Sequence, residues 1–223
     1  MHRVKATSGP KAGRTVLAVL FALAVLAASA HAQAIFSNQQ SAWTLKPGQI
    51  AIGGIFSNVS WHNGGNSAHA WNAYGVSMGF GLAQNIELCA RYEYLDPKYD
   101  QGASALSFGP KISFLKNIVA VYVPLEFAFG NDNFDVSDTW NVQPTLLATF
   151  PLGQRLEITP SFKALIPFKS GNDTLLAVSM GFGVFALENK KLLIRPEFGI
   201  LVNPGESGSY WQLSVGVSYR IKD

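Results

Sequence analysis

The stretch Ala73-Tyr74-Gly75-Val76-Ser77-Met78-Gly79-Phe80-Gly81-Leu82-Ala83-Gln84 decides the fold. From Tyr74 to Leu82 its even-numbered positions carry large apolar side chains, whereas the odd-numbered positions carry only Ala, Gly or Ser. Successive side chains of a β-strand point to opposite faces of the sheet. The stretch therefore predicts a strand with one large apolar face and one small face.

The same period of two recurs along the chain and predicts ten strands. We expect them at about residues 50–61, 71–83, 86–95, 104–114, 118–129, 139–150, 155–167, 174–185, 191–202 and 209–221. Each is close to the roughly 9 to 11 residues of a tilted membrane-spanning strand. The connections alternate between tight turns, such as Gln84-Asn85, and longer polar loops, such as His62 to Ala70. This alternation is typical of an up-and-down transmembrane β-barrel, and we predict a ten-stranded antiparallel one.

The first 32 residues have the pattern of a secretory signal peptide. They contain basic but no acidic residues, then an apolar run from Val16 to Ala28 and the small-residue tripeptide Ala30-His31-Ala32. The run is too short for a membrane-spanning helix, which needs roughly 20 residues. We therefore expect a signal peptide over residues 1–32, cleaved before Gln33, a periplasmic N-terminal segment over 33–48 and a transmembrane β-barrel over 49–223.

Composition excludes several classes of protein. Only 14% of the residues are charged, against roughly 25% in ordinary soluble domains. Without the signal peptide the net charge is close to zero, so a nucleic-acid partner, which needs a basic patch, is not expected. Cys89 is the single cysteine, so no intramolecular disulfide can form.

The residues on the two faces of the predicted strands indicate which face contacts lipid and which lines the lumen. Large aromatic residues gather at strand ends beside the longer loops, as in the aromatic girdle of a membrane barrel. The expected girdle consists of Trp61, Trp71, Tyr94, Trp140, Phe168, Tyr210 and Trp211. The opposite face carries charges that would be costly in lipid and must line the lumen. The expected lumen charge network consists of Glu87, Arg91, Glu93, Lys111, Glu126, Glu157, Lys163, Arg195, Glu197 and Arg220.

Such a lumen is narrow, because about eight strands leave room for side chains only and sixteen leave a channel. The charges can be a salt-bridge network that fills the barrel or a selectivity lining for a polar solute. Equal numbers of acids and bases favour the network. Five prolines lie within predicted strands, where proline cannot donate to the ladder, so we expect bulges or lumen-side waters there. They are Pro110, Pro124, Pro144, Pro160 and Pro196.

The chain resembles the outer-membrane β-barrel proteins of Gram-negative bacteria, in their porin-like and transporter-like branch. The resemblance rests on strand-turn-strand units such as Gly79 to Leu88, on Phe108-Gly109-Pro110-Lys111 and on Pro144 to Leu152. It implies an outer-membrane location, with outer-membrane lipid and the barrel assembly machinery as partners. The chain ends Tyr219-Arg220-Ile221-Lys222-Asp223, which departs from the terminal aromatic residue usual in this family.

No set of nucleophile, base and orienting group stands at a diagnostic spacing, so we expect no enzyme activity, no cofactor and no metal. The predicted function is that of an outer-membrane barrel that passes or binds a small polar solute through a narrow charged lumen. Two alternatives remain open. One is a structural or surface-interaction barrel with a plugged lumen, and the other is a secreted, soluble lipocalin-like barrel that binds a ligand.

Overall fold

The structure is a computed structural model, and it describes residues 35, 37–98, 101–132, 135–187 and 190–221. The predicted signal peptide, residues 1–32, lies outside the described residues. The chain separates into two units, Met1–Gln33 and Ala34–Asp223. All strands belong to the second unit.

The described residues form strands joined by turns and two single-turn 3-10 helices, η1 (Leu115–Asn117) and η2 (Val136–Asp138). The strands are β1 (Ile50–Asn63), β2 (Asn66–Ala83), β3 (Ile86–Pro97), β4 (Ala103–Phe114), β5 (Val119–Tyr122), β6 (Leu125–Phe129), β7 (Asn141–Val142), β8 (Thr145–Ala148), β9 (Phe150–Leu152), β10 (Leu156–Pro167), β11 (Leu175–Phe185), β12 (Leu192–Val202) and β13 (Ser209–Arg220). No described helix is long and apolar enough to cross a membrane.

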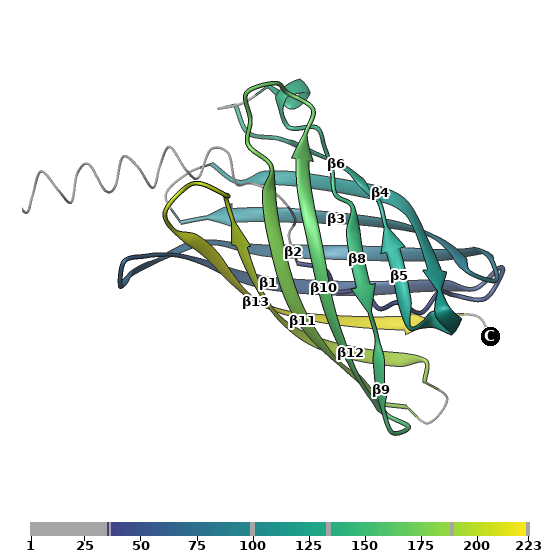
Figure 1. Cartoon of the computed structure of the whole chain (residues 1–223). Coiled ribbons are helices and arrows are strands. Elements are labelled where there is room, and N and C mark those ends of the chain that lie inside the picture. Colours follow the sequence, from purple (N-terminus) through teal and green to yellow (C-terminus); the bar gives the residue numbers. More distant parts are fainter. Residues whose placement is uncertain (1–34, 36, 99–100, 133–134, 188–189, 222–223) are drawn as a thin grey trace, which may run out of the picture. The chain divides into compact units, whose positions relative to one another are not determined.

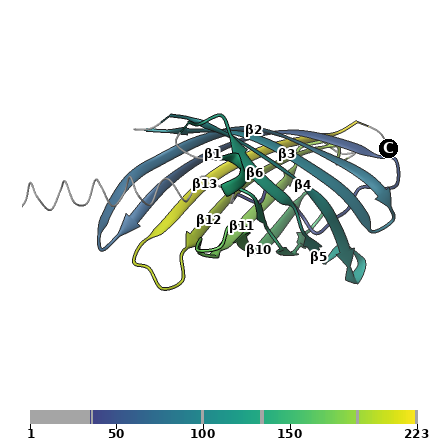
Figure 2. The same cartoon turned by 90° about the horizontal axis from the view of Figure 1, so that it is seen from above.

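These segments form one closed barrel of ten antiparallel strands, as predicted (Figures 1 and 2). Segments β5 and β6 are two halves of one strand, and β7, β8 and β9 are three parts of the next. The sheet closes because β13 pairs with β1 and β10 pairs with β11. Closure leaves no open sheet edge, which a membrane-spanning sheet cannot tolerate.

Two of the five prolines explain two of the three interruptions, and the third, at Thr149 between β8 and β9, contains none of the five. The strand of β5 and β6 is broken at Val123-Pro124, where the Val123 amide donates to the Pro110 carbonyl over 3.0 Å. The broken backbone leans against Gly109, at which a Cβ atom would lie 2.5 Å from the Cα atom of Pro124. Only glycine accommodates this close approach.

The next strand is broken at Gln143-Pro144 in the same way. The Gln143 amide donates to the Pro124 carbonyl over 2.9 Å, so the two breaks lie side by side. Pro110, Pro160 and Pro196 stay inside regular strands. Bulges are therefore not needed at most of the prolines.

The predicted long loop from His62 to Ala70 is wrong. Strands β1 and β2 continue to Asn63 and Asn66 and are joined by the two-residue turn Gly64-Gly65. Both glycines have positive φ angles, 54° and 85°, which a tight hairpin turn of this kind requires. The dark blue hairpin therefore extends well beyond its neighbours in Figure 1.

The apolar face points outward and the polar face inward. Val76 and Val178 are each 59% exposed and Leu213 is 65% exposed, although all three are aliphatic. The charged residues of the opposite face are buried. This arrangement is the inverse of a soluble ligand-binding barrel and contradicts the lipocalin-like alternative.

Candidate functional site

The lumen holds nine of the ten predicted network charges. Each projects from an inward position of its strand and is 7% exposed or less: Glu87, Arg91, Glu93, Lys111, Glu126, Glu157, Lys163, Arg195 and Glu197. Arg220 is the exception. It is half-buried near the end of β13, with its guanidinium carbon 6.0 Å from the centre of the Phe185 ring.

The ion pairs in the lumen are local. The Lys111 ammonium lies 3.1 Å from Glu87 on the neighbouring strand. Arg91 pairs with Glu93 two residues along β3, with Nε 2.9 Å from Oε1. Neither of these two pairs reaches across the barrel.

The third pair, Arg195 with Glu157, spans one intervening strand. That strand, β11, places Gly181 and Gly183 between them, and a Cβ atom at Gly183 would lie 2.5 Å from Cγ of Glu157. The missing side chains on β11 therefore leave the space in which Arg195 and Glu157 meet.

What spans the lumen is the chain itself. We call residues 35–49 the luminal segment, of which residue 36 is not described. The segment was expected in the periplasm, but Ile35, Ser37, Asn38, Ala42 and Leu45 are all buried inside the barrel. The expectation of a segment outside the barrel is therefore wrong for the described residues.

Polar side chains of the wall, most of them charged, bind the backbone of the luminal segment. Their hydrogen bonds come from strands on several sides of the barrel. Acceptors are Glu126 for the Ile35 amide (3.2 Å), Glu197 for the Asn38 and Gln39 amides (2.6 and 2.7 Å), Thr149 for the Ala42 amide (2.8 Å) and Glu87 for the Leu45 amide (2.9 Å). Donors are Arg91 to the Ser37 carbonyl (2.8 Å), Lys163 to the Ile35 and Ser37 carbonyls (3.2 and 3.3 Å) and Arg195 to the Gln40 carbonyl.

Glycines on the inner wall make room for the segment. A Cβ atom at Gly81 would collide with the Lys46 carbonyl oxygen, and one at Gly216 with the Gln39 amide oxygen. Gly81 also forms the one backbone anchor that the described residues show between wall and segment: its carbonyl accepts from Gly48 over 2.9 Å, and its amide donates to Gln49 over 3.0 Å.

The predicted aromatic girdle divides between the two faces. Tyr94, Phe168 and Trp211 are exposed, and Trp140 stacks on Phe127 with ring centres 4.6 Å apart. Trp71, by contrast, is 4% exposed and packs against Tyr210, with ring centres 5.4 Å apart.

Trp61 pairs directly with Tyr210, so it shares the inner face. The girdle assignment is therefore wrong for Trp61, Trp71 and Tyr210, which have the parity of inward residues. Instead, Phe56 and Tyr74 contact each other on the outer face of β1 and β2, with ring centres 5.4 Å apart.

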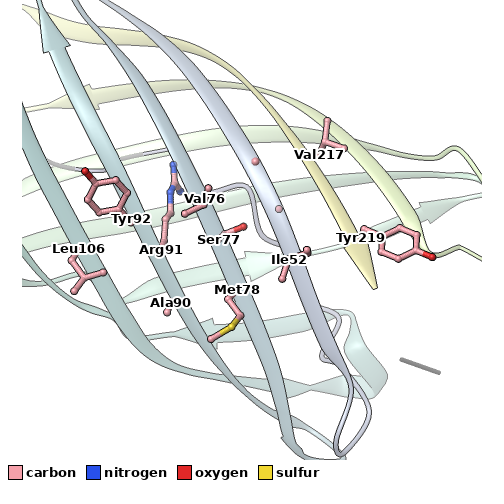
Figure 3. Close-up of a pocket in the computed structure, with 12 residues that line it drawn as sticks. Ile52, Val76, Ser77, Met78, Ala90, Arg91, Tyr92, Leu106, Val217 and Tyr219 are labelled. Atoms are coloured by element: carbon pink, nitrogen blue, oxygen red, sulfur yellow. The ribbon is translucent and has the colours of Figure 1, made fainter. Parts of the chain in front are cut away.

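The described outer wall has a hollow of about 570 Å³ whose lining includes Arg91 of the lumen network (Figure 3). Ile52, Val76 and Met78 are exposed around it, and the small residues Gly54 and Ala90 lower its floor. Its exposed side chains are apolar, which suits contact with lipid. Among the described residues no group of three or more His, Cys, Asp or Glu side chains could hold a metal ion.

No family model and no curated protein matches the sequence. Solved structures of outer-membrane barrels share the fold. An outer membrane channel from Pseudomonas putida F1 is 9% identical with a TM-score of 0.50, over 83% of this chain and 100% of that one. The translocator domain of autotransporter NalP from Neisseria meningitidis is 10% identical, with a TM-score of 0.44 over 93% of this chain and 98% of that one. At 9% identity the likeness to the Pseudomonas channel shows the fold alone.

The sequence did not reveal the luminal segment because residues 37–42, Ser-Asn-Gln-Gln-Ser-Ala, have no apolar period. Their burial depends on partners far away in the chain. The ten predicted lumen charges gave no signal either, because five acids and five bases can all pair with one another, whereas the structure leaves Glu126, Lys163 and Glu197 outside its described ion pairs. These three side chains bind the backbone of the luminal segment instead, because buried charges need partners.

Proposed function

We propose that the protein is an integral outer-membrane β-barrel that passes a small polar solute when the luminal segment leaves the lumen. The observation that carries the proposal is the way in which this segment is held. Apart from the Gly81 anchor, its described hydrogen bonds to the wall come from side chains. Water or a polar solute can replace such bonds one at a time. The backbone hydrogen bonds of a strand within the sheet would have to break together.

The lining that the segment would leave behind suits a polar solute. It contains carboxylates and cations at several levels, such as Glu126, Glu197 and Lys163, together with Ser and Thr hydroxyls. Rings of charged side chains are a common basis of pore selectivity. In this proposal the structure represents the closed form.

Bilayer recording tests the proposal. The intact protein is expected to show little steady conductance, whereas a variant lacking residues 37–44 keeps the Gly81 anchor and is expected to conduct steadily. A matched control that lacks residues 204–207, in the loop between β12 and β13, should behave like the intact protein. If the first variant is silent although it migrates as a folded barrel in gels, solute passage is refuted.

Silence of that kind would support the second candidate, a structural or surface-interaction barrel. Its motive is the burial of the ion pairs, which gives the plugged barrel a complete interior.

Location is tested separately. The protein should fractionate with the outer membrane, and a cysteine at Ser137 should be labelled on intact cells while one at Lys190 should not. The opposite labelling would contradict the proposed orientation.

A further inference from the structure

The luminal segment leads to a buried carboxylate at its N-terminal end. Ile35 is 2% exposed, and its backbone nitrogen lies 3.2 Å from Oε1 of Glu126. Glu126 is 1% exposed and projects inward from β6, three residues before that strand ends at Phe129. The backbone nitrogen of Ile35 is therefore inside the barrel, near the level at which the longer loops begin.

The charges of the described lumen do not balance. The nine buried charged residues comprise five carboxylates and four cations. Glu87, Glu93 and Glu157 each have an ion-pair partner, and Glu197 accepts two backbone amides. Glu126 accepts the Ile35 amide, but its Oε2 has no hydrogen-bond partner among the described residues.

Lys163, the fourth buried cation, attracts the Glu126 carboxylate electrostatically, but no described hydrogen bond joins the two side chains. Its ammonium has three donors, and these reach the Ile35 carbonyl, the Ser37 carbonyl and the Gln143 side chain over 3.2 to 3.3 Å. A second positive charge beside Glu126 would satisfy its free oxygen. It would also bring the buried charges to five of each sign.

The sequence offers such a charge at Ile35. A signal peptidase needs small residues at the first and third positions before the cut. At the end of the apolar run three overlapping tripeptides with Ala at both positions meet this need, Ala28-Ser29-Ala30, Ala30-His31-Ala32 and Ala32-Gln33-Ala34. Cleavage after the last one would turn the Ile35 nitrogen into an α-ammonium group at a position where it already faces Glu126.

We propose that the chain is cleaved between Ala34 and Ile35 and that the new α-ammonium of Ile35 forms a buried ion pair with Glu126. In this hydrolysis, water gives its hydroxyl to the Ala34 carbonyl carbon, and the Ile35 nitrogen takes up protons to become the ammonium. Capture of an N-terminal amine by buried acceptors is a known recognition mode. Processing thereby stabilises the closed barrel.

This inference rests on the export in the proposed function, not on solute passage. The sites can be separated genetically, because Ala30 belongs only to the two upstream tripeptides and Ala34 only to the last one. The full-length precursor is expressed in a Gram-negative host, and the N-terminus of the barrel from the outer membrane is sequenced. We expect Ile35 in the unchanged protein and in Ala30→Leu, and Gln33 in Ala34→Leu. A start at Gln33 in the unchanged protein would overturn the proposal.

The ion pair is tested by thermal unfolding of the extracted barrels. Glu126→Gln should lower the unfolding temperature by roughly 10 °C when the chain starts at Ile35, because it leaves a buried charge unpaired. In the Ala34→Leu background the same change should cost much less. Glu157→Gln, which breaks the pair with Arg195, is the matched control and should cost the same in both backgrounds. Equal losses for Glu126→Gln in both backgrounds would overturn the ion pair, and neither measurement depends on conductance.

Discussion

Replacing Arg91 by Ala should destabilise the barrel strongly. The change removes the guanidinium from Glu93, which is 2% exposed, and from the Ser37 carbonyl 2.8 Å away. An unpaired charge that is truly buried costs roughly 3 to 5 kcal/mol. If water fills the lumen, screening reduces the loss to well under about 1 kcal/mol. The size of the loss therefore reports whether the lumen around the luminal segment is dry.

A double-mutant cycle separates the ion pair from the other contacts. We expect Arg91→Ala combined with Glu93→Ala to lose less than the sum of the two single changes, because the second change removes the charge that the first left unpaired. Denaturant unfolding in detergent, followed by tryptophan fluorescence, measures each loss. Lys169→Ala is the control, since Lys169 pairs with Asp138 over 2.5 Å at the exposed surface and should cost at most about 1 kcal/mol.

Strict additivity, or a loss for Arg91→Ala no larger than that of the control, would refute the reasoning. It would mean that Arg91 and Glu93 line open water. The plugged lumen would then be wrong at this level of the barrel.

Gly81→Val should displace the C-terminal part of the luminal segment, since the valine side chain would occupy the position of the Lys46 carbonyl. Overpacking of this kind costs roughly 1 to 3 kcal/mol. Gly54→Val, with open space on the outer wall, is the control in the same unfolding assay. Brominated lipids should quench the fluorescence of Trp211, which is 42% exposed, and leave that of Trp71 largely unchanged. Quenching by these lipids should therefore fall in Trp211→Phe and stay nearly the same in Trp71→Phe. Equal quenching in the two variants would contradict the assignment of Trp211 and Trp71 to opposite faces.

The strands were predictable because each one is read from its own residues. Alternation such as that from Ala73 to Gln84 requires no knowledge of the rest of the chain, and the structure places β2 and β3 on either side of the predicted turn at Gln84-Asn85. The first hairpin was misjudged for a physical reason. Above Phe56 and Tyr74 the outer face becomes polar, with Asn58 bonded to Asn72 over 2.9 Å, so these strands continue where the apolar period has ended.

The faces of the aromatic residues were predictable but were assigned from the wrong property. Position near a strand end was used, whereas parity decides which way a side chain points. Trp71 has the parity of Ala73 and Gly75, and Tyr210 that of Gln212 and Ser214, so both belong inside. Parity would have separated them from Trp211 without any structure.

The luminal segment could not be derived from local pattern, because its burial depends on two distant parts of the chain. Each part would be unfavourable to bury without the other. An irregular backbone in a closed space has amides and carbonyls without partners, and a barrel wall with charges on its inner face has ions without partners. Glu197 accepts the Asn38 and Gln39 amides, and Arg91 donates to the Ser37 carbonyl, so each part satisfies the other. It follows that the wall charges need not pair only with one another. The equal numbers of acids and bases in the sequence had suggested that they would. Hydrogen-bond partners have to balance over wall and segment together, and the segment supplies them through its backbone amides and carbonyls.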